Sequence, residues 1–168
     1  MWRVNISDPN PANWTVSVLF QARDPGGNRQ PITTTPVVSL NPLVPALNGM
    51  MVYFGTGQYL GIPDLTNVQV QTVYGVFDSG AAAALPLLRA NLQQQTMTST
   101  AVTNLAGFST TIRQLSSNPV NLPAVKGWYV DLNLVSGERV VTDPTLFNGT
   151  LQVTTFQPNG STLSLIHI

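Results

Sequence analysis

The sequence predicts an all-β protein, more specifically a partial β-propeller of about two to three antiparallel blades whose ring is not closed. The first observation is composition: only 8% of the 168 residues are charged, Lys126 is the only lysine and Glu138 the only glutamate. Long helices usually place Glu and Lys on their solvated faces, so a chain rich in Thr and Val with 13 Gly and 13 Pro favours strands and turns. The second and third observations are short apolar runs between turn signals, and internal repeats.

The first expected strand covers residues 14–22. Apolar and polar residues alternate there, so Trp14, Val16, Val18 and Phe20 would share one face. Residues 24–28, with the sequence DPGGN, then form a turn, because Pro presets φ and Gly adopts positive φ. The remaining expected strands, in chain order, are residues 37–40, 50–55, 68–77, 92–99, 109–115, 127–132, 139–142 and 151–156.

Two of these segments carry further expectations. In residues 50–55, Val52 and Phe54 alternate within a run that should be covered on both faces, so both side chains are predicted to be buried. Residues 81–92 have helical propensity, but Pro86 limits any helix there to a turn or two.

The internal repeats give the propeller interpretation. A Pro-led segment, residues 35–38, precedes a Gly-led strand at residues 49–56, and the same order returns in residues 143–146 and 148–155. A second recurring element is aromatic and ends in Asn or Asp; it occurs at residues 2–5, 74–78 and 128–131. The spacings exceed the roughly 40–50 residues of a compact four-stranded blade, so loop insertions are expected. On the repeats alone, an unrelated β-sandwich is the alternative.

Several longer motifs resemble one family. Residues 51–60 read MVYFGTGQYL, and further matching segments are YGVFD at 74–78, KGWYVDL at 126–132, GERVVTDP at 137–144, TTFQP at 154–158, QPIT at 30–33 and LQQQT at 92–96. In this order they closely resemble the C-terminal propeller of PilY-type type IV pilus tip-associated adhesins, over about residues 1–158. The expected domain is therefore residues 1–160. Residues 161–168 (STLSLIHI) resemble translated sequencing-adaptor sequence and are predicted to be a tail that is not native protein.

The resemblance implies a non-enzymatic segment that takes part in pilus biogenesis, control of pilus retraction and surface adhesion. The partners that it implies are pilin and minor pilins, a host or abiotic surface, and the remaining blades of the same propeller. It also implies an exported protein at the pilus tip, cell surface, outer membrane or periplasm, with a signal peptide upstream of this segment. The family's calcium loop is expected elsewhere in the propeller, because residues 8–11 (DPNP) lack the length and the closing acidic ligand. No cofactor and no metal are expected in this segment.

Composition excludes several other classes. The formal net charge is zero and the pI is about 6.5, so no basic surface is present to neutralise phosphates, and nucleic acid is not an expected partner. The absence of Cys excludes a disulfide or thiolate metal site in this segment. The most apolar run, residues 81–88, is interrupted by Pro86 and is too short to cross a bilayer.

No catalytic, cofactor-binding or metal-binding residue is predicted. The only histidine, His167, lies in the predicted tail, so a Ser-His-Asp triad lacks its base. Two of the three carboxylates Asp131, Glu138 and Asp143 could in principle form the catalytic pair of a glycosidase. They are interpreted instead as strand-end and turn residues, with Glu138 solvated or paired with Arg139.

The other candidate features have structural interpretations. Residues 55–57 (GTG) are too short for a phosphate loop and are expected to end a strand. Four glycosylation-type sequons, at Asn5, Asn13, Asn148 and Asn159, are attributed to chance in a Thr- and Asn-rich chain. The aromatic residues that could stack on a sugar but are expected to pack between blades are Tyr53, Tyr59, Trp128 and Tyr129.

Two rival functions remain open from the sequence. A quinoprotein-type dehydrogenase propeller shares the Gly-Thr-Gly and aromatic-Asp elements, and it would require a quinone pocket, a calcium ion and a catalytic Asp. An extracellular carbohydrate-binding propeller is the other alternative.

Overall fold

The computed structural model describes residues 1–81, 85–103 and 107–158. Within them the chain is all-β, as the sequence predicts, with three short 3₁₀ turns: η1 (Pro11–Asn13), η2 (Ile62–Leu65) and η3 (Arg89–Asn91). The strands are β1 (Trp2–Asn5), β2 (Thr15–Val18), β3 (Val37–Leu40), β4 (Met50–Gly55), β5 (Gln71–Asp78), β6 (Gln93–Gln95), β7 (Met97–Thr103), β8 (Ser109–Leu115), β9 (Gly127–Leu132), β10 (Thr145–Phe147) and β11 (Thr150–Gln152).

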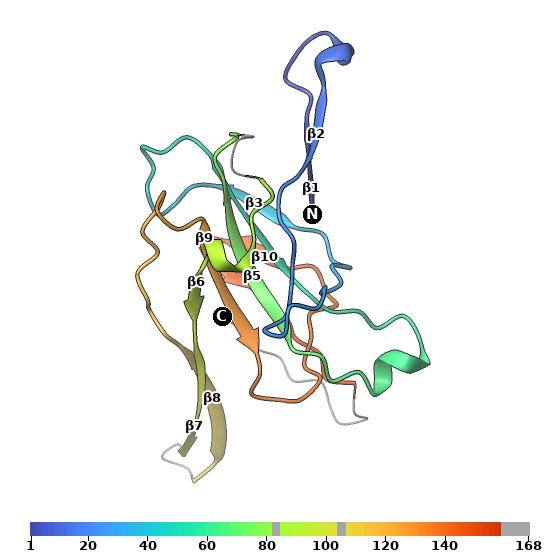
Figure 1. Cartoon of the computed structure of the whole chain (residues 1–168). Coiled ribbons are helices and arrows are strands. Elements are labelled where there is room, and N and C mark those ends of the chain that lie inside the picture. The colour runs from blue at the N-terminus through green and yellow to red at the C-terminus, as the bar shows by residue number, and fades with distance from the viewer. Residues whose placement is uncertain (82–84, 104–106, 159–168) are drawn as a thin grey trace.

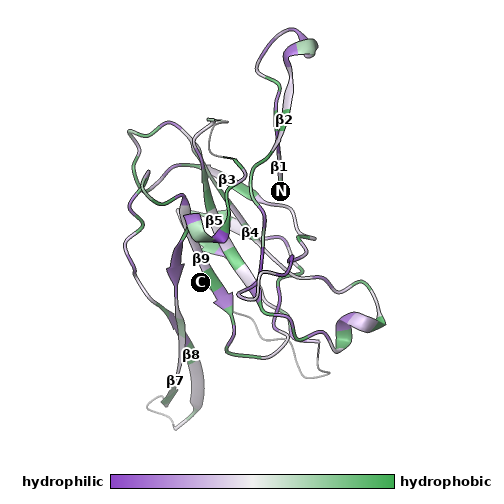
Figure 2. Cartoon of the chain, in the orientation of Figure 1, coloured by the Kyte–Doolittle hydropathy of each residue, from purple (hydrophilic) through white to green (hydrophobic). Residues whose placement is uncertain are grey.

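A five-stranded sheet in the order β3-β4-β5-β9-β6 forms the centre of the molecule (Figure 1). Its first four strands follow one another in antiparallel pairs, so they make the four-stranded meander of a propeller blade. The short strand β6 then adds to β9 in the parallel direction. Figure 2 shows this hydrophilic strand at the edge, beside the more hydrophobic centre of the sheet. The three two-stranded sheets β1-β2, β7-β8 and β10-β11 surround this blade.

A long insertion separates the third and fourth strands of the blade. Between β5 and β9 the chain forms η3, β6 and the β7-β8 hairpin, which extends away from the central sheet (Figure 1). This insertion is one of the loop additions that the long repeat spacing predicts.

The chain before the blade and the chain after it cover opposite faces of the central sheet. On the first face, Phe54 and Tyr74 contact Phe20, which lies in the segment preceding the blade. On the second face, Met51, Tyr53 and Phe77 form a cluster against which Leu146 of β10 and Leu151 of β11 pack. Successive blades of a propeller stack in this manner, each sheet lying between its neighbours in sequence.

The burial predicted for β4 is confirmed. The side chains of Val52 and Phe54 are buried on the first face, and those of Met51 and Tyr53 are buried on the second. From Met51 to Gly55 the strand is therefore apolar without alternation, because both of its faces are covered there.

The Pro-led and Gly-led repeat corresponds to two equivalent hairpins. Strand β3 follows Pro36 and pairs antiparallel with β4 after Gly49, and β10 follows Pro144 and pairs antiparallel with β11 after Gly149. In the second hairpin Asn148 and Gly149 have φ of 48° and 77°, which is the Asn-Gly turn that matches the twist of paired strands.

The aromatic repeat has a different meaning. Its second and third copies lie in β5 and β9, which are adjacent strands of the same sheet, with Gly75 opposite Trp128. A Cβ atom on Gly75 would lie 2.6 Å from the Trp128 indole, so glycine leaves the space that the indole fills. Its first copy, residues 2–5, lies in β1 of a separate sheet. The spacing between the second and third copies therefore separates strands of one blade and not successive blades.

The strand expected at residues 14–22 is shorter than predicted. Only Thr15–Val18 forms β2, which pairs with β1 in a hairpin that extends from the sheet (Figure 1). Trp14, just before β2, and Val16 within it are exposed, whereas Leu19 and Phe20 after it are buried against the central sheet. The strand ends at Val18 because the following residues leave the hairpin to cover the first face.

Four other predicted boundaries need correction. The strand expected at residues 68–77 is β5, Gln71–Asp78, which begins three residues later and ends one residue later. Residues 139–142 form no strand, since the Arg139 amide donates to Phe156 and the Val140 amide donates to Thr56, two different neighbours that cannot continue one ladder. Residues 92–99 divide at Thr96 into β6 and β7. Of residues 151–156, only the beginning lies in a strand, β11, and Phe156 makes one isolated bridge. In the described part of residues 81–92, the helical structure is the short turn η3, within the limit of a turn or two that was expected.

Candidate functional site

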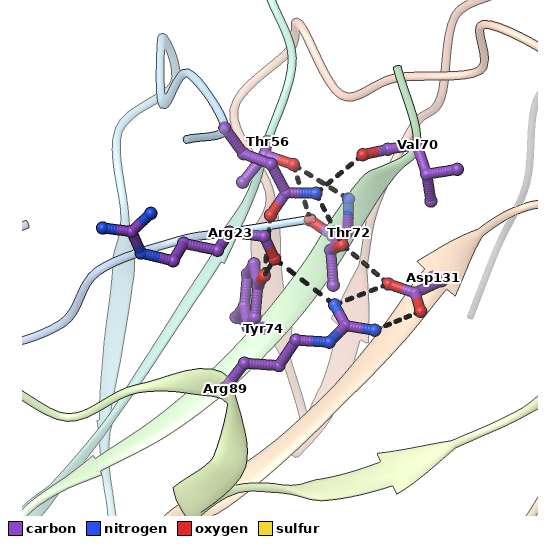
Figure 3. Close-up of polar contacts among 8 residues, drawn as sticks. Arg23, Thr56, Val70, Thr72, Tyr74, Arg89 and Asp131 are labelled. Carbon is purple, nitrogen blue, oxygen red and sulfur yellow. Dashed lines mark hydrogen bonds and ion pairs between the residues drawn. The ribbon is translucent and has the colours of Figure 1, made fainter. Parts of the chain in front are cut away.

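A buried polar cluster lies on the first face of the sheet, where the polar ends of β5 and β9 meet (Figure 3). We call it the Asp131 cluster. Its members come from four segments: Gln30 from the chain before the blade, Thr72 and Tyr74 from β5, Arg89 from η3 of the insertion, and Asp131 from β9. Burial makes each of these polar groups costly unless it is hydrogen-bonded.

An ion pair is at the centre of the cluster. Arg89 donates from one terminal nitrogen to one Asp131 oxygen at 2.9 Å and from the other nitrogen to the second oxygen, which gives a bidentate pair. The same guanidinium lies over the Tyr129 ring, 3.9 Å from its centroid. Burial alone lowers the pKa of Arg89, but the hydrogen bonds and negative charge of Asp131 outweigh it, so the pKa is raised.

The remaining members form a chain of hydrogen bonds. The Thr72 hydroxyl donates to Asp131 at 2.8 Å, the Gln30 amide donates to the Thr72 hydroxyl at 2.8 Å, and the Tyr74 hydroxyl donates to Gln30 at 2.7 Å. Burial raises the pKa of Tyr74, so its phenol is a neutral donor. The cluster fastens both the preceding chain and the insertion to the blade.

The three carboxylates considered from the sequence belong to separate networks. Asp131 is engaged by Arg89, whereas Asp143 accepts the Thr35 amide at 2.7 Å. Glu138 accepts from Arg113 at 2.5 Å and from the Thr155 hydroxyl at 2.6 Å.

The prediction that Glu138 is solvated or paired with Arg139 is wrong. Glu138 is only 3% exposed, and its ion-pair partner is Arg113 of β8. Adjacent residues of an extended segment point to opposite sides, so Arg139 cannot readily reach its neighbour's carboxylate. Arg139 is itself buried and donates to the carbonyls of Gln58, Asp64 and Asn67. Burial lowers its pKa, and the charge of Asp64 opposes that effect.

The strand-end Asn and Asp residues behave in two ways. Asn5 accepts the Ser7 amide at 3.0 Å and Asp78 accepts the Gly80 amide at 2.8 Å, which are the local backbone bonds expected of them. Asp78 also pairs with Arg3, 75 positions away, at 2.8 Å, and Asp131 is bound by the side chains of Thr72 and Arg89. The sequence offered no signal for these partners, because they lie 42 or more positions away.

The aromatic candidates mostly pack within the protein. The rings of Tyr53 and Trp128 lie 6.3 Å apart on the second face, and Tyr129 is buried beneath Arg89. Tyr59 is the most exposed of the four and contacts the Phe156 ring at 5.0 Å. Strand β4 ends at Gly55, as the Gly-Thr-Gly sequence predicts.

The described residues contain no group of three or more His, Cys, Asp or Glu side chains placed to hold a metal ion. In residues 8–11, the Asp8 carboxylate accepts from the Asn10 amide and the Asn13 side chain, so it stabilises a turn. No helix among the described residues has the length and apolarity to span a bilayer. His167, Asn159 and the predicted tail, residues 161–168, lie outside the described residues.

Comparison with known proteins gives a consistent result. A family model described as the PilY1 beta-propeller domain matches residues 3–110. A type IV pilus biogenesis factor PilY1 homolog of Xylella fastidiosa is 31% identical over 96% of this chain, which spans 11% of that relative. Type IV pilus biogenesis factor PilY1 of Pseudomonas aeruginosa is 34% identical over 84% of the chain, which spans 13% of it. The crystal structure of the P. aeruginosa PilY1 C-terminal domain superposes with a TM-score of 0.72 and 32% identity, covering 88% of this chain and 33% of that one. This chain belongs to the PilY1 β-propeller family.

Proposed function

We propose that this chain is a non-enzymatic propeller segment of a type IV pilus biogenesis factor that is exported and acts at the pilus tip and cell surface. The observation that carries the proposal is the family match over residues 3–110, joined to relatives that are type IV pilus biogenesis factors. Within that role the segment supports pilus assembly, control of retraction and adhesion to a host or abiotic surface. Its partners are pilin, minor pilins and the remaining blades of the propeller.

The polar chemistry of the blade supports a scaffolding role. The charged groups of the Asp131 cluster and of the Glu138–Arg113 pair bind one another across segments that are distant in sequence. Such contacts position the insertion and the flanking chain against the sheet. They hold the insertion and the flanking chain in one arrangement, so that binding surfaces on them keep a fixed geometry.

The uncovered apolar surface supports neighbouring blades as partners. A cleft of about 650 Å³ lies between β1 and the β3-β4 edge of the first face, with Trp2, Val38 and Met50 among its lining residues. These three side chains are 69%, 49% and 47% exposed. Apolar area of this kind on a propeller sheet is normally covered by the adjacent blade.

Disruption of the blade in the full-length parent tests the proposal. Phe54→Asp places a charge in the core, and Ile62→Asp in the η2 turn, outside the sheets and 82% exposed, is the control. In the producing bacterium, the first variant should reduce surface pili and pilus-driven motility to the level of the gene deletion, and the second should not. Counting surface pili again in a strain that cannot retract them distinguishes a defect in pilus assembly from a change in pilus retraction. Normal piliation, motility and attachment in the deletion strain would refute the proposal.

The non-enzymatic part of the proposal has its own test. The full-length parent, purified with calcium, should show no quinone in its mass spectrum and no cofactor band in its visible spectrum. A bound quinone would favour a dehydrogenase and overturn this part of the proposal.

A further inference from the structure

The β7-β8 hairpin is an unusually unprotected element of the insertion. It forms a sheet of two strands that extends from the body of the molecule (Figure 1). Most of its residues are exposed on both faces. A two-stranded hairpin is marginally stable in water, and a third strand or a packed face is normally needed to stabilise it.

The register identifies which backbone groups point outward. The Ser116 amide donates to the Thr96 carbonyl at 2.8 Å, and these residues are opposite in the register that pairs Met97 with Leu115. In an antiparallel pair, the residues that bond to the partner strand alternate with residues that do not. The amide and carbonyl groups of Ser99 and Ala101 therefore point away from β8.

This outward edge continues an edge that already accepts a strand. Strand β7 follows β6 directly after Thr96, and β6 pairs with β9 through residues 93–95. By the same alternation, the odd-numbered residues of β6 and β7 direct their backbone groups to the side on which β9 lies. Strand β9 ends at Leu132, whereas β7 continues to Thr103. The outer edge of β7 is therefore unpaired beyond the end of β9.

The side chains of the hairpin define the kind of strand that fits. The only charged residue in β7 and β8 is Arg113, and it is paired with Glu138 at the base of the hairpin. Neither strand contains Pro. Natural edge strands are usually protected from pairing by charges, Pro or bulges. Strand β7 contains no charged residue and no Pro. Its exposed side chains are small and neutral, such as Thr98, Ser99 and Thr100.

We propose that the outer edge of β7 binds an extended, uncharged strand of a pilus subunit by strand addition, with Ser99 and Ala101 supplying main-chain hydrogen bonds. This inference rests on the proposed function, which makes pilus subunits the partners.

Two proline substitutions test the assignment in the full-length parent. Ala101→Pro removes an outward amide of β7 and leaves the bonds to β8 intact, because Pro is tolerated where an edge N–H faces solvent. Thr111→Pro is the matched control: Thr111 is opposite Ala101 in β8, and its amide points to the other outer edge. The probes are the purified soluble domains of the producing organism's pilin and minor pilins, each measured alone by biolayer interferometry.

We expect one of these domains to bind, Ala101→Pro to weaken binding by about tenfold, and Thr111→Pro to change it by less than about twofold. Hydrogen exchange should show the amides of Ser99 and Ala101 protected in the wild-type complex. Equal binding of both variants, without that protection, would overturn the inference and leave the proposed function standing. Loss of binding in Thr111→Pro alone would also overturn the inference, because it would place the binding site on the outer edge of β8. If no domain binds the wild-type parent, the proposed partners and this inference both fail. Should Ala101→Pro unfold, Ser99→Pro and the wild-type exchange data decide.

Discussion

Replacing Phe54 by Ala tests the two-sided burial of the blade. The Phe54 side chain is fully buried, and its ring lies 5.9 Å from that of Phe20 and 5.2 Å from that of Tyr74. Burial of a Phe side chain contributes about 1.5–3 kcal/mol, and each aromatic pair adds about 0.5–1.5 kcal/mol. The expected loss in the free energy of unfolding is therefore about 3–5 kcal/mol, the range of aromatic truncations in cores.

Urea unfolding of the complete propeller domain measures this loss, with the slope m unchanged. Ile62→Ala is the control, because Ile62 is 82% exposed in the η2 turn, outside the sheets. It should change the free energy of unfolding by less than about 0.5 kcal/mol. A loss below about 1 kcal/mol for Phe54→Ala, or equal losses for the two variants, would mean that the first face is open to solvent and that the register of β4 is wrong.

Four further outcomes are expected. Gly75→Ala should destabilise the domain by about 1–3 kcal/mol, because the new Cβ would lie 2.6 Å from the Trp128 indole, whereas Gly61→Ala meets no atom nearer than 3.7 Å and should be almost neutral; thermal unfolding compares them. Hydrogen bonds from the Gln58 side chain and the Leu60 amide lower the pKa of Asp64 below 3.8, so stability falls as pH drops below that value and through the folded-state pKa, and Asp64→Asn should flatten this part of an acid titration. Calorimetric titration of the segment should detect no calcium affinity tighter than about millimolar, and micromolar binding would contradict the expectation that the site lies elsewhere. The isolated 168 residues should associate, with or without the residues after Gly160, and a cooperative monomer in size-exclusion chromatography with light scattering would favour a self-contained β-sandwich.

Local sequence patterns predicted the blade strands well. The bounds of the blade strands β3, β4 and β9, and of β8 in the insertion, are those expected from apolar or β-branched runs between turn residues, while β5 begins three residues later than expected. In each case the residues that predict the strand lie within about ten positions of it, and the pairing with neighbouring strands is consistent with the same bounds.

The contacts that fix the insertion could not be predicted, because their partners are distant. The Glu138–Arg113 bond joins residues 25 positions apart, and the Asp131–Arg89 bond joins residues 42 positions apart. Nothing in the sequence around Glu138 distinguishes Arg113 from the adjacent Arg139 as its partner. The early end of β2 has a similar origin, since Phe20 leaves the strand to pack on a sheet formed by later residues.

The placement of the two buried ion pairs bears on how the insertion functions. Asp131–Arg89 lies at the beginning of the insertion, and Glu138–Arg113 lies at the base of the β7-β8 hairpin. A buried ion pair contributes little net stability, because desolvation offsets most of its attraction, but loss of one partner is costly. Such pairs therefore penalise other arrangements of the insertion more than they stabilise the observed one. A hairpin fixed at its base in this way holds the edge of β7 in one position relative to the blade, as a strand-addition site requires.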